Sequence, residues 1–167
     1  MTAVTWALHD RADLPGSLAW LAPDERARLD AMHVAKRRDD FLLGRWTAKR
    51  ALAARLSPAP PLAALAIRPA ADGAPEAYLD GAALPVTLSL SHSAGRALAA
   101  VCDAGTALGA DLERVEPRSE LLVDEFFTPG EAAHIAACPP PGRDRAITLI
   151  WSAKESALKA RRTGLRE

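Results

Sequence analysis

The carboxylates of "GADLE" (109–113) are the residues whose spacing most directly indicates chemistry. The surrounding residues predict a strand, and alternate side chains of a strand lie on one face, so Asp111 and Glu113 would share a face with Gly109. Two carboxylates this close repel each other, and burying either one unpaired is costly. The pattern therefore predicts a cation beside them. Gly109 either keeps space open for a ligand or allows tight packing of the strand.

A helix expected over 144–162, which Gly164 could end, supplies a third carboxylate. Lys154 falls in the middle of the apolar stripe of this helix, Glu155 lies at the stripe's edge, and Lys159 lies one turn beyond Glu155. Charged groups on an inward face need partners. Two interpretations stay open: these residues serve a site, or Lys154 lays its stem over apolar surface while Glu155 pairs with Lys159.

Two cations repeat this pattern on an earlier helical segment, 23–56, which we expect to break near His33. Arg45 and Lys49 are one turn apart in the middle of a broad apolar face. Neighbouring cations on an inward face indicate an anion with several charges, and phosphate groups are the obvious candidate. The alternative is two long stems over apolar surface with their charged ends in water.

The stretch "SLSHS" (89–93) ends a predicted strand with Ser89, Ser91 and His92. A serine next to a histidine can form a nucleophile and base, but the G-x-S-x-G turn is missing and no acid is placed to orient the histidine. Hydrogen bonding to a phosphate fits these residues better, and a turn or capping role is the alternative. Glu131, three residues after Thr128, is assigned to a helix capping box.

Taken together, these residue types fit one site. Carboxylates are hard oxygen ligands suited to Mg²⁺, which commonly bridges phosphates, and cations with an imidazole can hold further phosphate. The expected metal ligands are Asp111, Glu113 and Glu155, and the expected phosphate contacts are Arg45, Lys49 and His92. The residues alone indicate Mg²⁺-dependent handling of a phosphorylated small molecule and do not identify the reaction.

Composition narrows the class of protein. The chain has 167 residues, enough for one domain or two small halves, and 21 basic residues balance 21 acidic ones, which argues against general nucleic-acid binding. No signal peptide and no membrane-spanning segment is expected. Cys102 and Cys138 are too few for a disulfide framework, so reduced thiols in the cytoplasm are expected.

The elements that must position these residues are strands followed by helices. Helices are expected over 23–56, 121–127, 128–138 and 144–162, with a loop at 138–143. Strands are expected at 4–10, within 65–81 around turns at 72–73 and 80–81, and at 85–93, 96–103 and "GADLE". This order indicates an α+β fold.

Several of these stretches, in their order, resemble the 4′-phosphopantetheinyl transferase superfamily of the Sfp type. They are "FLLGRWTAKRAL", "SLSHS", "GADLE", "FFTPGEAA" and "WSAKESALKA". The resemblance implies transfer of the phosphopantetheine arm of coenzyme A to a serine of an acyl or peptidyl carrier protein, with release of adenosine 3′,5′-bisphosphate. It implies a pseudo-twofold fold of two α+β halves, here 1–104 and 105–167.

Residue roles follow from the same resemblance. Asp111, Glu113 and Glu155 match the Mg²⁺ ligands, and Glu155 also matches the proposed general base. The coenzyme A contacts are matched by Arg45, Lys49, Arg50, Ser91, His92 and Lys159. Lys154 matches a lysine of the motif to which we assign electrostatic support of catalysis.

The sequence departs from the family pattern at two places. Ala74 stands where many members have a coenzyme A-binding lysine, and the chain ends where the strands of the second half would begin, so that half is expected to be incomplete. The alternative function is a non-catalytic remnant that binds coenzyme A or a carrier protein. A monomer is expected unless a second chain completes the sheet.

Overall fold

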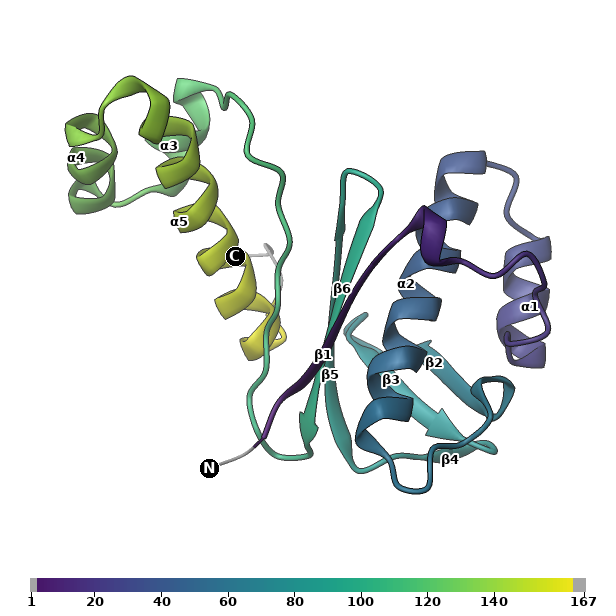
Figure 1. Cartoon of the computed structure of the whole chain (residues 1–167). Coiled ribbons are helices and arrows are strands. Elements are labelled where there is room, and N and C mark those ends of the chain that lie inside the picture. The colour runs from purple at the N-terminus through teal and green to yellow at the C-terminus, as the bar shows by residue number, and fades with distance from the viewer. Residues whose placement is uncertain (1–2, 164–167) are drawn as a thin grey trace.

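The computed structural model describes residues 3–163 and shows an α+β fold, as predicted (Figure 1). Its strands are β1 (Thr5–Asp10), β2 (Leu65–Pro69), β3 (Pro75–Leu79), β4 (Ala82–Ala83), β5 (Val86–Ser93) and β6 (Arg96–Asp103). Its helices are α1 (Pro23–Asp30), α2 (Ala35–Arg55), α3 (Glu120–Phe126), α4 (Pro129–Ala137) and α5 (Pro140–Arg161), with short 3₁₀ turns at Arg11–Asp13 and Leu62–Ala64.

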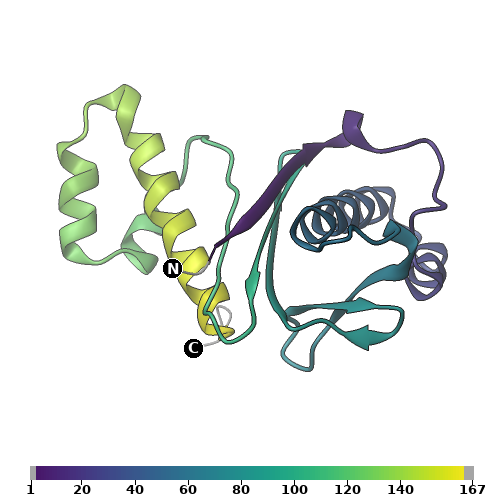
Figure 2. The same ribbon diagram turned by 60° about the horizontal axis from the view of Figure 1, so that its bottom comes forward.

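Helix α2 is the centre of the N-terminal part of the molecule. One antiparallel sheet has the order β1-β6-β5 and the other the order β2-β3-β4. Figure 2 shows α2 nearly end-on within the curve that the two sheets form. The shared core is built of small and branched side chains from α2 and both sheets, including Ala48, Leu52, Ile67, Leu88 and Val101. Burial of these apolar groups is the main force that holds the three layers together.

The expected break near His33 is confirmed, because α1 ends at Asp30 and α2 begins at Ala35. Arg38 on the first turns of α2 closes this corner. Its guanidinium donates to the carbonyls of Leu29 (2.6 Å) and Met32 (3.0 Å), which lie at the end of α1 and in the link. Carbonyls at the end of a helix need such donors.

Helices α3, α4 and α5 form a second, smaller core around Val123, Phe127, Ile135 and Ile147. The predicted capping box of α4 is confirmed: Thr128 accepts from the Glu131 N–H, and the Glu131 carboxylate accepts from the Thr128 N–H at 2.8 Å. The loop expected at 138–143 is wrong, because α5 already begins at Pro140. Proline suits the first turn of a helix, where its missing N–H has no partner to lose.

Residues 104–119 connect the two parts, and this segment is neither helix nor strand in the described structure. The strand expected at "GADLE" is therefore wrong. The backbone groups of Ala110 are bound by side chains instead of a neighbouring strand: its N–H donates to Ser89 Oγ (2.9 Å), and its carbonyl accepts from Lys159 Nζ (3.3 Å).

Gly109 has a clear structural role in this segment. A Cβ built at Gly109 would lie 1.8 Å from the Ser156 carbonyl oxygen and 2.8 Å from the Ala160 nitrogen, both in the backbone of α5. Tight packing, one of the two explanations left open by the sequence, is therefore the reason for glycine here. It lets the segment lie directly against α5, which brings Asp111 next to that helix.

The remaining expectations concern the cysteines, membrane-spanning segments and the division of the chain into halves. Cys102 and Cys138 are both free thiols. None of the helices within residues 3–163 is long and apolar enough to cross a membrane. The division into halves at 104 and 105 stays a prediction, and the helix stop at Gly164 lies outside the described residues.

Candidate functional site

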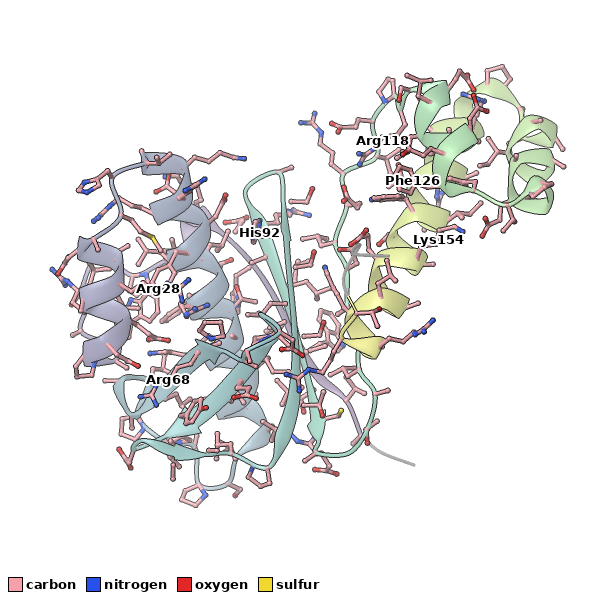
Figure 3. All side chains as sticks on the ribbon, turned by 180° about the vertical axis from the view of Figure 1, so that it is seen from behind. Arg28, Arg68, His92, Arg118, Phe126 and Lys154 are labelled. Carbon is pink, nitrogen blue, oxygen red and sulfur yellow. The ribbon has the colours of Figure 1, made fainter. Side chains whose placement is uncertain are left out.

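A cavity of about 500 Å³ lies between α2, the end of α1, the β2–β3 turn and the end of β5. Its walls are strongly basic. The cationic and imidazole side chains that line it are Arg28, Arg37, Arg45, Arg68 and His92, with Asp40 as an acidic member. Arg28, Arg68 and His92 lie on the same side of the molecule in Figure 3. Such a surface suits a ligand that carries several negative charges.

Arg45 is the predicted cation that does line this cavity. Its guanidinium lies 4.6 Å from the centre of the Phe41 ring, and its side chain is 12% exposed. Its Nε lies 3.4 Å from Glu25 Oε1. The ring and the carboxylate fix the guanidinium in one position, so little side-chain entropy remains to be lost when an anion binds.

Lys49 has a different role from the one expected. It is fully buried, and its Nζ contacts Glu25 Oε2 at 2.6 Å and donates to the Trp20 carbonyl at 2.9 Å. Burial lowers the pKa of Lys49, and the hydrogen bond and charge of Glu25 oppose that shift. Lys49 has no route to a ligand in this arrangement, which corrects its assignment as a phosphate contact.

Arg50, also expected at coenzyme A, lies elsewhere. It is exposed on α2, with its guanidinium 5.6 Å from the centre of the Trp46 ring. Arg45, Lys49 and Arg50 thus have three different environments, and of these three only Arg45 lines the basic cavity.

Ser91 joins this cavity to the carboxylates. It lines the cavity together with His92, and its hydroxyl donates to Asp111 Oδ1 at 2.8 Å. Ser89, two residues earlier on the same face of β5, holds the N–H of Ala110. Ser89 and Ser91 thus anchor the segment that carries Asp111, whereas His92 is exposed at the cavity wall. Ser91 also lines the basic cavity, so its expected contact with a phosphate stays a prediction beside this positioning role.

Asp111 is almost completely buried and is held by several donors. Lys159 Nζ lies 2.6 Å from Asp111 Oδ1. Burial alone would raise the pKa of Asp111, but hydrogen bonds from Lys159 and Ser91 help to outweigh it and hold this pKa below its ordinary value. Asp111 is therefore a carboxylate anion at neutral pH.

Glu155 lies near Asp111 and has few compensating contacts. Burial raises the pKa of Glu155, and the negative charges of Asp111 and Glu113 raise it further, against the opposing charge of Lys159. Glu155 Oε1 and Asp111 Oδ2 are both buried and have no hydrogen-bond partner among the residues of the described structure. Buried carboxylate oxygens of this kind are costly unless a cation or a donor reaches them.

Glu113 departs from the expected metal cluster. Its carboxylate forms an ion pair with Arg118 Nη2 at 2.8 Å. Within residues 3–163, no group of three or more His, Cys, Asp or Glu side chains is placed to hold a metal ion. The expected cluster is therefore incomplete as it stands. The donors still suit Mg²⁺, because two buried oxygens of Asp111 and Glu155 lack partners in the described structure and carboxylates are its preferred ligands.

Lys154 and Lys159 of α5 have different partners. Lys159 contacts Asp111, so the pairing with Glu155 that was left open gives way to a pairing across the site. Lys154 contacts Glu131 Oε2 at 2.8 Å and lies 5.6 Å from the centre of the Phe127 ring. Lys154 therefore ties α5 to the start of α4, and Glu131 combines its capping role with this ion pair. The electrostatic support of catalysis that was assigned to Lys154 stays a prediction.

A second cavity, of about 640 Å³, lies on the other side of the β2–β3 turn, between β5 and the end of α5. Lys159 lines it. Arg162 crosses its edge and donates to both carboxylate oxygens of Asp72, at 2.7 and 2.9 Å. Ala74 lies in this same turn, so a cation from α5 stands close to the position where a lysine was expected.

Some residues of the site could not be found from the sequence. Glu25, Arg28, Arg68 and Arg118 are charged residues in polar surroundings, and nothing in their local pattern distinguishes them from surface residues. The role of Glu25 depends on Lys49, a partner far away in the chain, whereas Arg118 pairs with the nearby Glu113. Ser89 was recognisable as part of "SLSHS", although its hydrogen bond to the Ala110 backbone was not.

Part of the chain is similar in sequence to a known family of proteins. Residues 107–167 match the family model described as the 4′-phosphopantetheinyl transferase superfamily. A curated Synechocystis protein, a putative 4′-phosphopantetheinyl transferase, is 27% identical over 158 residues, which cover 93% of this chain. The chain spans 63% of the length of that relative.

A solved structure supports the fold assignment. It is a holo-(acyl-carrier-protein) synthase from Bacillus anthracis in complex with CoA (3′,5′-ADP). Its TM-score to this chain is 0.50 at 18% identity, and the match covers 63% of this chain and all of that one. Residues 107–167 thus resemble the 4′-phosphopantetheinyl transferase superfamily in sequence, and the solved structure shows that the fold is shared.

Proposed function

We propose that this protein transfers the 4′-phosphopantetheine arm of coenzyme A to a serine of an acyl or peptidyl carrier protein and releases adenosine 3′,5′-bisphosphate. The observation that carries the proposal is the position of Ser91. One hydroxyl lines a basic cavity suited to a polyanion and also binds Asp111 of the carboxylate group. A ligand with a phosphate-rich end and a reactive pyrophosphate fits such a pair of neighbouring surfaces.

Different residues would bind the phosphates and the metal ion. Arg45 and His92 would hold phosphates of coenzyme A in the basic cavity, helped by Arg28 and Arg68. Asp111 and Glu155, with Glu113, would hold Mg²⁺, which when bound neutralises charge on the pyrophosphate. Lys159, already at Asp111, supplies a further positive charge beside these carboxylates.

The reaction needs a base for the carrier serine. The serine oxygen forms a bond to the phosphorus that bears the pantetheine arm, and the bond from that phosphorus to the leaving adenosine bisphosphate breaks. Glu155 is suited to accept the serine proton, because burial and neighbouring carboxylates raise its pKa above that of an ordinary glutamate. A carboxylate with a raised pKa is a stronger base.

A mass-spectrometric assay tests this function. The purified chain is incubated with coenzyme A, Mg²⁺ and an apo-carrier protein, and the carrier is followed for the mass gain of one phosphopantetheine arm. We expect the gain to require Mg²⁺ and the carrier serine, so a serine-to-alanine carrier is the matched control. A carrier that stays at its apo mass with every carrier type tested would contradict the proposal.

Binding of coenzyme A without transfer is the second candidate. It is favoured by the ion pair between Glu113 and Arg118, which keeps one expected metal ligand occupied. Isothermal titration with adenosine 3′,5′-bisphosphate separates the candidates. Binding that depends on Arg45, combined with an unchanged carrier mass, would support this non-catalytic role.

A further inference from the structure

We propose that Arg118 is an internal counter-ion for Glu113, which a divalent cation must displace, and that Glu116 takes over Arg118 when this happens. The inference rests on the proposed function only in assuming that a divalent cation binds beside Asp111 and Glu155. It assigns roles to two residues outside that set. Arg118 and Glu116 are positioning residues here, because they act through Glu113.

The first support is the placement of Arg118. Its side chain is 22% exposed, and its Nε is buried without a hydrogen-bond partner in the described part of the chain. Arg118 directly precedes Ser119, the N-cap of α3, so its backbone is fixed by that helix (Figure 3). The backbone of Arg118 is therefore anchored near Glu113, and the guanidinium can contact either neighbouring carboxylate.

The second support is a second carboxylate, that of Glu116, close to Arg118. The same nitrogen, Arg118 Nη2, lies 2.8 Å from Glu113 Oε2 and 3.9 Å from Glu116 Oε1. Glu116 is half-exposed and needs only a short side-chain movement to form a hydrogen bond. A partly buried guanidinium that lost Glu113 would thus keep a carboxylate partner, which reduces the cost of releasing Glu113.

The third support is the charge of the neighbourhood. Asp111 already has Lys159 as its cation, whereas Glu155 Oε1 and Asp111 Oδ2 lack partners in the described structure. A divalent cation at those oxygens would attract Glu113, two residues along an irregular segment from Asp111. Arg118 competes for this carboxylate and so sets how readily the third ligand joins.

Direct metal binding tests the proposal without measuring activity. The full chain is titrated with Mn²⁺ in the absence of coenzyme A, and free Mn²⁺ is measured by its EPR signal. We expect Arg118→Gln to tighten Mn²⁺ binding about fivefold, because it removes the competitor of a partly exposed ion pair. Arg118→Lys, which keeps the charge, should stay within about twofold of the wild type.

The matched control is Arg114→Gln, which removes an exposed arginine next to Glu113. Arg114 has no ion pair within the described residues. If general electrostatics were the cause, Arg114→Gln would tighten Mn²⁺ as much as Arg118→Gln, and the proposal would be wrong. Thermal unfolding of each variant confirms that it is folded at the titration temperature.

A variant of Glu116 provides a second, independent test of the proposal. We expect Glu116→Gln to weaken Mn²⁺ binding about twofold to threefold in the wild type, since Arg118 then loses its second partner. The same change should have no effect in the Arg118→Gln background. An equal effect in both backgrounds would show that Glu116 acts by its charge alone and would overturn the exchange.

The outcomes separate this proposal from the proposed function. Equal Mn²⁺ affinity of the wild type and Arg118→Gln overturns the counter-ion role and leaves the metal site standing. Absence of Mn²⁺ binding in both overturns the counter-ion role together with the metal assignment. Tighter binding by Arg118→Gln alone supports the counter-ion role whether or not transfer to a carrier is detected.

Discussion

Two ionic clusters of this protein look alike in sequence and differ in what their carboxylates lack. In the first, both oxygens of Glu25 are satisfied, by Lys49, Arg45 and the N–H groups of Ala22 and Ile67. In the second, three carboxylates meet two cations, and two buried oxygens have no partner in the described structure. Both clusters contain buried charge at a junction between elements.

The presence or absence of unpartnered carboxylate oxygens distinguishes a cluster that holds the fold together from a cluster that can bind a ligand. The Glu25 cluster joins α1, α2 and β2, and both oxygens of Glu25 are used, so it offers no free carboxylate to a cation, although Arg45 at its edge lines the basic cavity. The Asp111 cluster joins the 104–119 segment to α5 and has an excess of negative charge, which a cation would balance. A fully satisfied buried pair indicates architecture, and an unsatisfied one indicates binding.

The largest effect on stability should come from breaking the satisfied cluster. Lys49→Met leaves Glu25 buried without its main cation and should lower the free energy of unfolding by about 3–5 kcal/mol. Urea denaturation measures this loss. The double variant Glu25→Gln with Lys49→Met is the control: the amide oxygen still accepts from the backbone, and the loss should be clearly smaller. Equal losses would show that the charge pairing is unimportant.

The unsatisfied cluster should respond in the opposite way. Asp111→Asn keeps the size of the side chain and removes its charge, so we expect transfer to fall at least about hundredfold. The free energy of unfolding should change less than in Lys49→Met, because Lys159 is 30% exposed and water can replace the lost charge of its partner. The carrier mass assay and urea denaturation, run on the same protein sample, provide both readouts. Retained transfer would argue against a catalytic carboxylate at 111.

Much of the fold was visible in the sequence because it depends on local pattern. Alternation of apolar and polar residues located β1, β5 and β6, and Thr128 with Glu131 marked the start of α4. The strand predicted at "GADLE" had the same alternation and was wrong. Its backbone groups are bound by Ser89 and Lys159, which come from distant parts of the chain.

The candidate site was predictable as a set of residue types and unpredictable as a set of partners. Asp111, Glu155 and Lys159 do lie together. Lys49 and Lys154 carry the same inward pattern along their helices but pair with Glu25 and Glu131. Helical periodicity gives the face on which a lysine lies and says nothing of the carboxylate that another element places opposite it.

Gly109 tests how firmly the second cluster depends on packing. Gly109→Ala places a Cβ against the backbone of α5, which cannot move aside as a side chain can, so the segment must shift. We expect a loss of about 1–3 kcal/mol in unfolding free energy together with a drop in transfer. Gly130→Ala is the control, because a Cβ there meets nothing within 4 Å. Unchanged stability of Gly109→Ala would contradict the close approach.

The smallest effect on stability is expected at the partly exposed pair of Lys154 and Glu131. It gives a reference against which the effects in the two buried clusters can be compared. Their side chains are 29% and 31% exposed, so water competes with the ion pair. Lys154→Met and Glu131→Gln should each lower the unfolding free energy only slightly through the lost pair, by much less than Lys49→Met. In the double variant the two losses should not add, because either change alone already breaks the contact. Additive losses in urea denaturation would mean that the two residues act separately, and that Lys154 stabilises α5 through the Phe127 ring and not through the start of α4.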